Sequence, residues 1–119
     1  MVRRLIVMRH AKSSWKDPNL DDHERPLNKR GRRDAPMVAD AIFERGWIPE
    51  LILVSSSKRT LQTLEGMSHR MGKTPFEVRS GIYHATVIDL VTELEDMLDN
   101  GTTMIIGHNP GSEILVNHL

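Results

Sequence analysis

The stretch Leu5-Ile6-Val7-Met8 is a continuous apolar run that ends abruptly at Arg9-His10. Two runs of the same kind follow it along the chain, at Leu51–Val54 and Met104–Ile106. Continuous apolar runs are typical of strands that are covered on both faces, as in parallel sheets, whereas strands with one wet face alternate. We therefore expect these runs to be strands of one mostly parallel sheet.

Helical patterns fill the intervals between the apolar runs. The first pattern, 38–43, stops at Gly46; Asn28 or Asp34 could cap it, and Pro36 leaves its start undefined. The second, 61–71, stops at Gly72. The third, 88–98, has a capping box at Thr86 and Asp89 and stops at Asn100-Gly101, and the fourth covers 112–119. A weaker fourth strand is expected around 77–83. This alternation predicts an α/β three-layer sandwich, in which a doubly wound, mostly parallel sheet is flanked by helices.

Length and composition favour one soluble domain spanning residues 1–119. The chain has 119 residues, of which 39% are apolar, close to the length of about 150 residues that is usual for one domain. Because cysteine is absent, disulfides, thiolate chemistry and Cys-ligated metals are excluded. The apolar runs are too short for a membrane span or a signal-peptide core. We expect a cytoplasmic protein that does not bind membranes.

The formal net charge of zero conceals an uneven distribution. Residues 1–33 contain ten Lys/Arg and four Asp/Glu, whereas residues 34–119 contain six and twelve. Such a split is typical of a nucleic-acid-binding arm, a pocket for a small anion, or a solvated basic face. The five aromatic residues are not interleaved with the cations, as a surface for stacked bases would require. Nucleic-acid binding is therefore disfavoured.

Polar residues follow each apolar run where the expected strand ends. Arg9 and His10 follow the first run, Ser55–Arg59 the second, and Gly107–Gly111, which includes His108, the third. Ligands of open parallel sheets bind beyond the carboxyl ends of the strands. We therefore expect two arginines and two histidines to converge at one edge of the sheet.

These residue types suit a phosphoryl group. Arginine matches phosphate oxygens, histidine acts as nucleophile or donor near neutral pH, and the Ser55–Ser57 turn offers backbone N–H groups at a helix start. Covalent catalysis by histidine needs a neutral imidazole with a free nitrogen and cations on the phosphoryl oxygens. His10, with Arg9, Arg59 and His108, satisfies this requirement. If Arg59 is a residue of a helix's first turn, its cation is disfavoured there unless an anion is near.

A metal site is disfavoured. The chain has no His-x-His or His-x-x-x-His spacing, and two arginines would repel a divalent cation. We expect neither a metal nor any other cofactor.

Four segments, in order, resemble the signatures of the histidine phosphatase superfamily, and most of all its SixA-like phosphohistidine phosphatases. They are Leu5–Trp15, Asp22–Gly31, Ser55–Thr63 and Gly107–Gly111. The resemblance implies a phosphoglycerate mutase-like fold in which His10 is transiently phosphorylated while Arg9, Arg59 and His108 hold the phosphoryl group. It also implies that Arg25 lies near the phosphate, with Ser13 as a further contact. Ala11 stands where the family's Arg-His-Gly triplet has glycine.

The sequence lacks an evident general acid. Larger relatives place a carboxylate after the third strand, whereas residues 81–86 here contain none. Asp22, Glu24 and His84 are the alternatives. An imidazole that is already protonated leaves as a neutral ring, so it needs a general acid less than an alkoxide does. The absence of an evident acid therefore favours a phosphohistidine substrate.

The expected function is therefore that of a metal-independent phosphatase acting through a phosphohistidine intermediate on a phosphorylated protein. Two alternatives stay open: a phosphatase for small phosphorylated metabolites, and a binding module that holds a phosphorylated ligand without turnover. The chain also stops at residues 116–119, within an apolar helical pattern, and SixA-like relatives extend further. We expect the domain to be incomplete at its C-terminal end.

Overall fold

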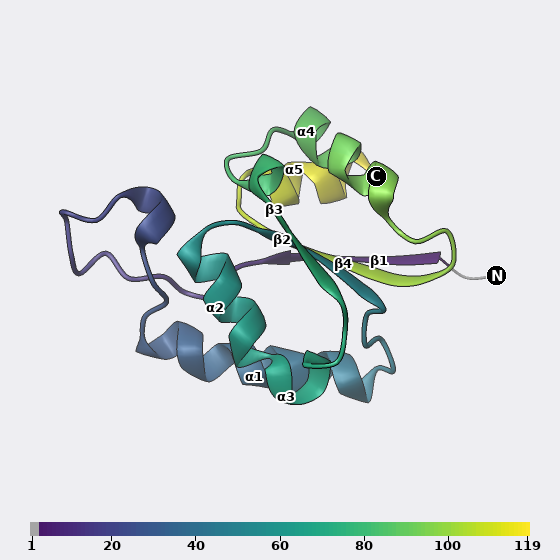
Figure 1. The fold of residues 1–119 in the computed structure, drawn as a ribbon, viewed down its shortest axis with the longest axis horizontal. Coiled ribbons are helices and arrows are strands. Elements are labelled where there is room, and N and C mark those ends of the chain that lie inside the picture. The colour runs from purple at the N-terminus through teal and green to yellow at the C-terminus, as the bar shows by residue number, and fades with distance from the viewer. Residues whose placement is uncertain (1–2) are drawn as a thin grey trace.

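Within the part of the chain that the computed structural model describes, residues 3–119, four parallel strands form one sheet (Figure 1). They are β1 (Arg3–Arg9), β2 (Leu51–Ser55), β3 (Phe76–Arg79) and β4 (Gly101–Gly107), in the order β1-β4-β2-β3. The expected parallel sheet is confirmed. Because Arg9 pairs with Gly107, the segments that follow β1 and β4 leave the sheet side by side.

Helices cover both faces of the sheet. α1 (Lys29–Glu44), α2 (Lys58–Gly66) and α3 (Ser68–Met71) lie on one face, and α4 (Val87–Glu93) and α5 (Gly111–His118) on the other (Figure 1). Three short 3-10 turns, η1 (Asp22–Glu24), η2 (Ser80–Ile82) and η3 (Leu94–Asp96), lie in the connections. No helix within residues 3–119 is long and apolar enough to cross a bilayer.

The core is divided by the sheet into two clusters. Successive residues of a strand point to opposite faces, so Val54 packs with the α1–α3 layer and Leu53 with the α4–α5 layer. Ile106 and Ile105 of β4 divide in the same way. This two-sided burial explains why β2 and β4 appear in the sequence as unbroken apolar runs.

The helix boundaries settle one open alternative, the cap of the first helix, and differ from the expected ones in two places. α1 begins after Asn28, whose Oδ1 accepts a hydrogen bond from Gly31 N (2.8 Å), and it continues through Pro36. The expected helix 61–71 is two helices that break at Met67. The expected helix 88–98 ends at Glu93, and Gly101, expected as its stop, instead opens β4 with φ +92°. A turn into a strand at positive φ favours glycine just as a helix stop does, so the sequence signal is ambiguous.

The segment between β1 and α1 extends beyond the carboxyl end of the sheet (Figure 1). It returns through an isolated bridge between Ser13 and Leu27 and a hydrogen bond from Asn28 N to Lys12 O (3.0 Å). A Cβ on Gly31 would collide with the Lys12 carbonyl, so glycine lets α1 start against this segment. The segment thereby forms one wall beside the strand ends.

Candidate active site

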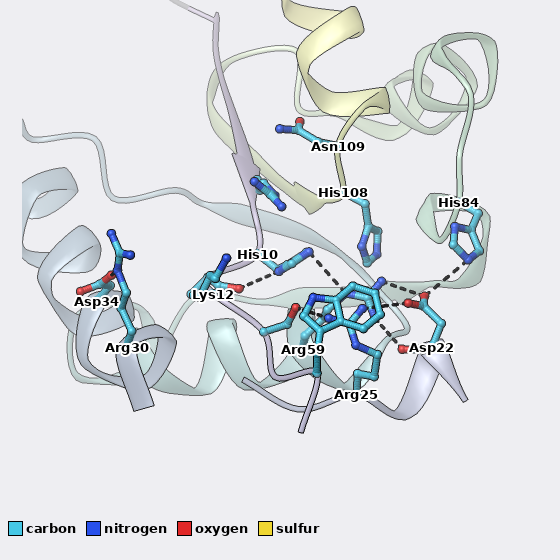
Figure 2. A pocket seen from close by; sticks show the side chains of 14 residues that line it. His10, Lys12, Asp22, Arg25, Arg30, Asp34, Arg59, His84, His108 and Asn109 are labelled. Atoms are coloured by element: carbon cyan, nitrogen blue, oxygen red, sulfur yellow. Dashed lines mark hydrogen bonds and ion pairs between the residues drawn. The ribbon is translucent and has the colours of Figure 1, made fainter. Parts of the chain in front are cut away.

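The strand ends open into a cavity of about 520 Å³ (Figure 2). All six predicted site residues line it: Arg9, His10, Ser13, Arg25, Arg59 and His108. The remaining lining residues are Ala11, Lys12, Trp15, Asp22, Arg30, Asp34, His84 and Asn109. The structure therefore brings together lining residues that are up to 100 positions apart in the sequence.

His10 lies at the first residue after β1, where its backbone N–H donates to Gly107 O (3.1 Å). Its Nδ1 lies 2.6 Å from Ala11 O. A carbonyl only accepts, so Nδ1 carries the hydrogen and Nε2 keeps its lone pair. Burial, and then the charges of Arg59 and Arg9, lower the pKa of His10. The imidazole is therefore neutral near pH 7, and the lone pair on Nε2 accepts a hydrogen bond from Arg59 Nε (3.3 Å).

His108 follows β4, and its ring centroid lies 5.3 Å from that of His10. Its Nε2 is 2.8 Å from Ser55 Oγ, which also accepts from Ser57 N (3.5 Å). Among residues 3–119 the buried Ser55 hydroxyl has no other acceptor for its proton, so it donates to Nε2. The imidazole hydrogen is then on Nδ1, which is buried without a hydrogen-bond partner among residues 3–119. Burial, followed by the charge of Arg59, lowers the pKa of His108 to about 3. His108 thus offers a neutral, unsatisfied N–H donor.

Arg59 and Arg25 are buried arginines, with 5% and 6% of their surface exposed. Arg59 is the second residue of α2, after the N-cap Ser57. A cation in the first turn of a helix is expected to have an anion near it, and here that anion is the side chain of Asp22. Asp22 accepts from Arg59 Nη2 and from Arg25 Nη1, both at 2.9 Å, and its backbone carbonyl accepts from Arg59 Nη1 (2.6 Å).

Asp22 was one alternative for the general acid, and the structure argues against that role. The Tyr83 hydroxyl donates to Asp22 Oδ2 (2.6 Å), and this bond, together with those from Arg59 and Arg25, holds the pKa of the carboxyl well below its usual range. Asp22 therefore stays ionised and orients two arginines. Nothing in the sequence pointed to this bridge, because Tyr83 lies 61 residues away.

Ser13 and Trp15 hold Arg25 from two sides. Arg25 Nη2 donates to Ser13 Oγ (2.7 Å), and its guanidinium lies over the Trp15 ring, 3.2 Å from the centroid. Trp15 remains 74% exposed at the cavity mouth. Sequence reasoning missed Trp15, since its place in the motif gave no sign of a cation–π contact.

Two further expectations are corrected. Ser55–Ser57 do not line the cavity, and the Ser57 N–H is directed to Ser55 Oγ rather than to an anion. Glu24 contacts His23 (3.4 Å) and lies outside the cavity, whereas His84 lines it. Residues 3–119 contain no cluster of three or more His, Asp or Glu that could hold a metal ion.

Sequence comparison relates this chain to a known family. Residues 5–84 match the profile of the histidine phosphatase superfamily, branch 1. An uncharacterized chloroplastic protein of Arabidopsis thaliana is 38% identical, over 93% of this chain and 56% of its own length. An uncharacterized protein of Mycobacterium tuberculosis is 32% identical, over 91% of this chain and 66% of its own length. The chain thus spans less than two thirds of each relative.

Solved structures share the fold. The SixA protein of Agrobacterium tumefaciens, provisionally assigned as a phosphohistidine phosphatase, has a TM-score of 0.90 and 28% identity, over 97% of this chain and 75% of its own. The SixA protein from Nakamurella, with the same provisional assignment, has a TM-score of 0.84 and 25% identity, over 95% and 63%. A protein histidine phosphatase SixA complexed with tungstate has a TM-score of 0.82 and 24% identity, over 97% of this chain and 75% of its own. At this identity the match shows the fold alone. The expected phosphoglycerate mutase-like sandwich is confirmed.

Proposed function

Because the chain belongs to the histidine phosphatase superfamily, we propose that it is a metal-independent phosphatase acting by double displacement at His10. One observation carries this proposal. The neutral imidazole of His10 is held by Ala11 O so that its unprotonated Nε2 faces a cavity lined by arginines. Such a group is an activated nucleophile for phosphorus.

In the first displacement, Nε2 of His10 forms a bond to phosphorus as the bond to the leaving atom breaks. The electron pair of the broken bond stays on the leaving group. Arg59 and Arg25 each have five N–H donors and use three of them within residues 3–119, so two on each would be available for phosphoryl oxygens. Nδ1–H of His108 is buried without a partner among residues 3–119, and it would supply a further donor without adding charge where a phosphoryl oxygen lies against it. These groups would stabilise charge on the oxygens as the phosphoryl group is transferred.

In the second displacement, water attacks phosphorus, the N–P bond breaks, and its electron pair returns to Nε2. Phosphate then leaves. No step requires a metal, because the arginines take the place that a divalent cation would otherwise occupy and would repel it. Activity should therefore survive a chelator.

A phosphohistidine on a protein is the substrate that the site favours. The cavity opens beside the exposed Trp15 and the cations Lys12 and Arg30, which suits a large anionic partner. The Agrobacterium protein, which is 28% identical to this chain and is provisionally assigned as a phosphohistidine phosphatase, supports the same substrate. A phosphatase for small phosphate esters is the second candidate, favoured by a titratable side chain at the cavity mouth, His84.

A substrate panel tests this proposal. Wild type, His10→Ala and His69→Ala would be assayed on a phosphohistidine peptide, sugar phosphates and nucleotides, with and without chelator. His69 is a matched control, since it lies on α3 and contacts Asp40 away from the cavity. We expect turnover in wild type and His69→Ala only, fastest on the peptide. Tight vanadate binding without turnover of any substrate would instead indicate a binding module.

A further inference from the structure

His84 occupies an unusual backbone conformation at the mouth of the cavity. It lies between η2 and α4 with φ +55°, the one non-glycine residue with positive φ among residues 3–119. Side chains with a Cβ rarely adopt this conformation, and the exceptions gather at functional sites. Ala85 O is close to Gly111, where a Cβ would lie 2.6 Å from it, so the start of α5 packs tightly against this turn. The turn is therefore fixed by packing, and its strained conformation places His84 in the lining of the cavity.

The surroundings of His84 orient its ring. Its Nε2 lies 3.5 Å from Asp22 Oδ2, and its ring centroid lies 4.0 Å from that of Tyr83 and 6.5 Å from that of His108. The titratable and charged groups that face it are thus Asp22, Tyr83 and His108, with Arg59 beyond Tyr83. The side chain is 67% exposed, so a substrate entering the cavity can reach it.

The other groups near this position are poor proton donors. Asp22 is held ionised by Tyr83 and the two arginines, and Glu24 lies outside the cavity. The Tyr83 proton is committed to Asp22, and burial raises the pKa of the phenol. Histidine is the side chain that most often donates protons in catalysis near neutral pH.

The three imidazoles form a row across the cavity. His108 lies between His10 and His84, with ring separations of 5.3 and 6.5 Å (Figure 2). In phosphoryl transfer the attacking and leaving atoms lie roughly in line on opposite sides of phosphorus. With phosphorus attacked by His10 Nε2 and one of its equatorial oxygens on His108, a leaving atom opposite Nε2 lies on the side of the cavity where His84 is found.

We propose that His84 is the proton donor to the leaving group, which extends the reaction of this site to phosphate esters with poor leaving groups. This role rests on the proposed function. In the first displacement, the P–O bond breaks, its electrons remain on oxygen, and that oxygen takes the proton from the imidazolium of His84. In the second, neutral His84 accepts a proton from the attacking water, which restores the imidazolium as phosphate forms.

The test compares leaving groups that differ in their need for a proton. Wild type, His84→Asn and His23→Asn would be assayed on p-nitrophenyl phosphate and phenyl phosphate. Asn tolerates positive φ, so the turn should keep its shape. His23 is the control, because its ring also packs against that of Tyr83, with 4.7 Å between the ring centroids, but it does not line the cavity.

For His84→Asn we expect kcat/KM on phenyl phosphate to fall by about 100-fold or more, and on p-nitrophenyl phosphate by less than about tenfold. The alkaline limb of the phenyl phosphate pH profile should disappear, and added imidazole should restore rate to His84→Gly. His23→Asn should match wild type.

An equal loss on both substrates, or an unchanged pH profile in an active His84→Asn, would overturn the role of His84 alone. Absence of turnover and of phosphorylated His10 in wild type would instead overturn the proposed function, and this role with it.

Discussion

The segment after β1 and the segment after β4 each place a histidine at the same edge of the sheet, yet they hold it in opposite ways. His10 is fixed through Nδ1 by the carbonyl of its own neighbour Ala11. His108 is fixed through Nε2 by a side chain from another strand end, Ser55. His10 therefore keeps a lone pair on Nε2, which accepts from Arg59 Nε, and His108 keeps a buried N–H without a partner among residues 3–119.

The difference shows that two buried neutral histidines acquire different chemistry from the nitrogen that the protein holds. Burial lowers the pKa of both, so charge does not distinguish them. The hydrogen-bond partner sets the tautomer, and the tautomer separates a nucleophile from a donor. The two segments should therefore respond differently to substitution.

The largest expected effect is at His10. His10→Ala removes the atom that forms the bond to phosphorus, so kcat/KM should fall by about 10⁴-fold or more. Turnover of a phosphohistidine peptide or p-nitrophenyl phosphate measures this, with circular dichroism as a control for folding. Retention of more than a tenth of the wild-type rate would show that His10 is not the nucleophile.

His108→Ala should cost less, because it removes a donor and leaves the nucleophile. The loss of one preorganised donor typically lowers kcat by about 10²–10³-fold. Single-turnover kinetics should still show phosphorylation of His10, only slower. Complete loss of labelling would mean that His108 takes part in bond formation itself.

Ser55→Ala tests the tautomer of His108 directly. Without the hydroxyl, Nε2 loses its 2.8 Å partner, the ring no longer has a fixed hydrogen position, and kcat should fall about tenfold. Ser56→Ala is the matched control, since Ser56 contacts His23 and not the cavity. Equal activity of the two serine variants would remove Ser55 from the site.

The smallest expected effect is on the pH dependence of the free energy of unfolding. The pKa of His108 is about 3 in the folded state and near 6.5 when unfolded, so the unfolded chain binds the proton more readily. The stability from neutral His108 is complete above pH 6.5 and is lost as the pH falls toward 3. Urea unfolding of wild type and His108→Gln at pH 7 and pH 5 should show a smaller pH dependence in the variant. A dependence of equal size would contradict the depressed pKa.

The sequence was sufficient where chemistry follows directly from a strand. Continuous apolar runs specified the parallel sheet, and the residues after them specified which side chains meet, because carboxyl ends of parallel strands share one edge. Asp22 could not be placed in the same way. It lies in the long β1–α1 connection, and its partners Arg59 and Tyr83 come from elements 37 and 61 residues away. The break at Met67 was also hidden, since one apolar stripe continues across both helices.

Trapping the intermediate tests the assignment of His10 most directly. The full chain would be mixed with a radiolabelled phosphodonor, quenched within milliseconds under alkaline conditions, and mapped by peptide mass spectrometry. We expect an acid-labile, alkali-stable phosphate on His10 that forms and decays at the rate of turnover, and no label in His10→Ala. Turnover with label on His108 or another residue, or with no covalent intermediate, would contradict the proposed mechanism.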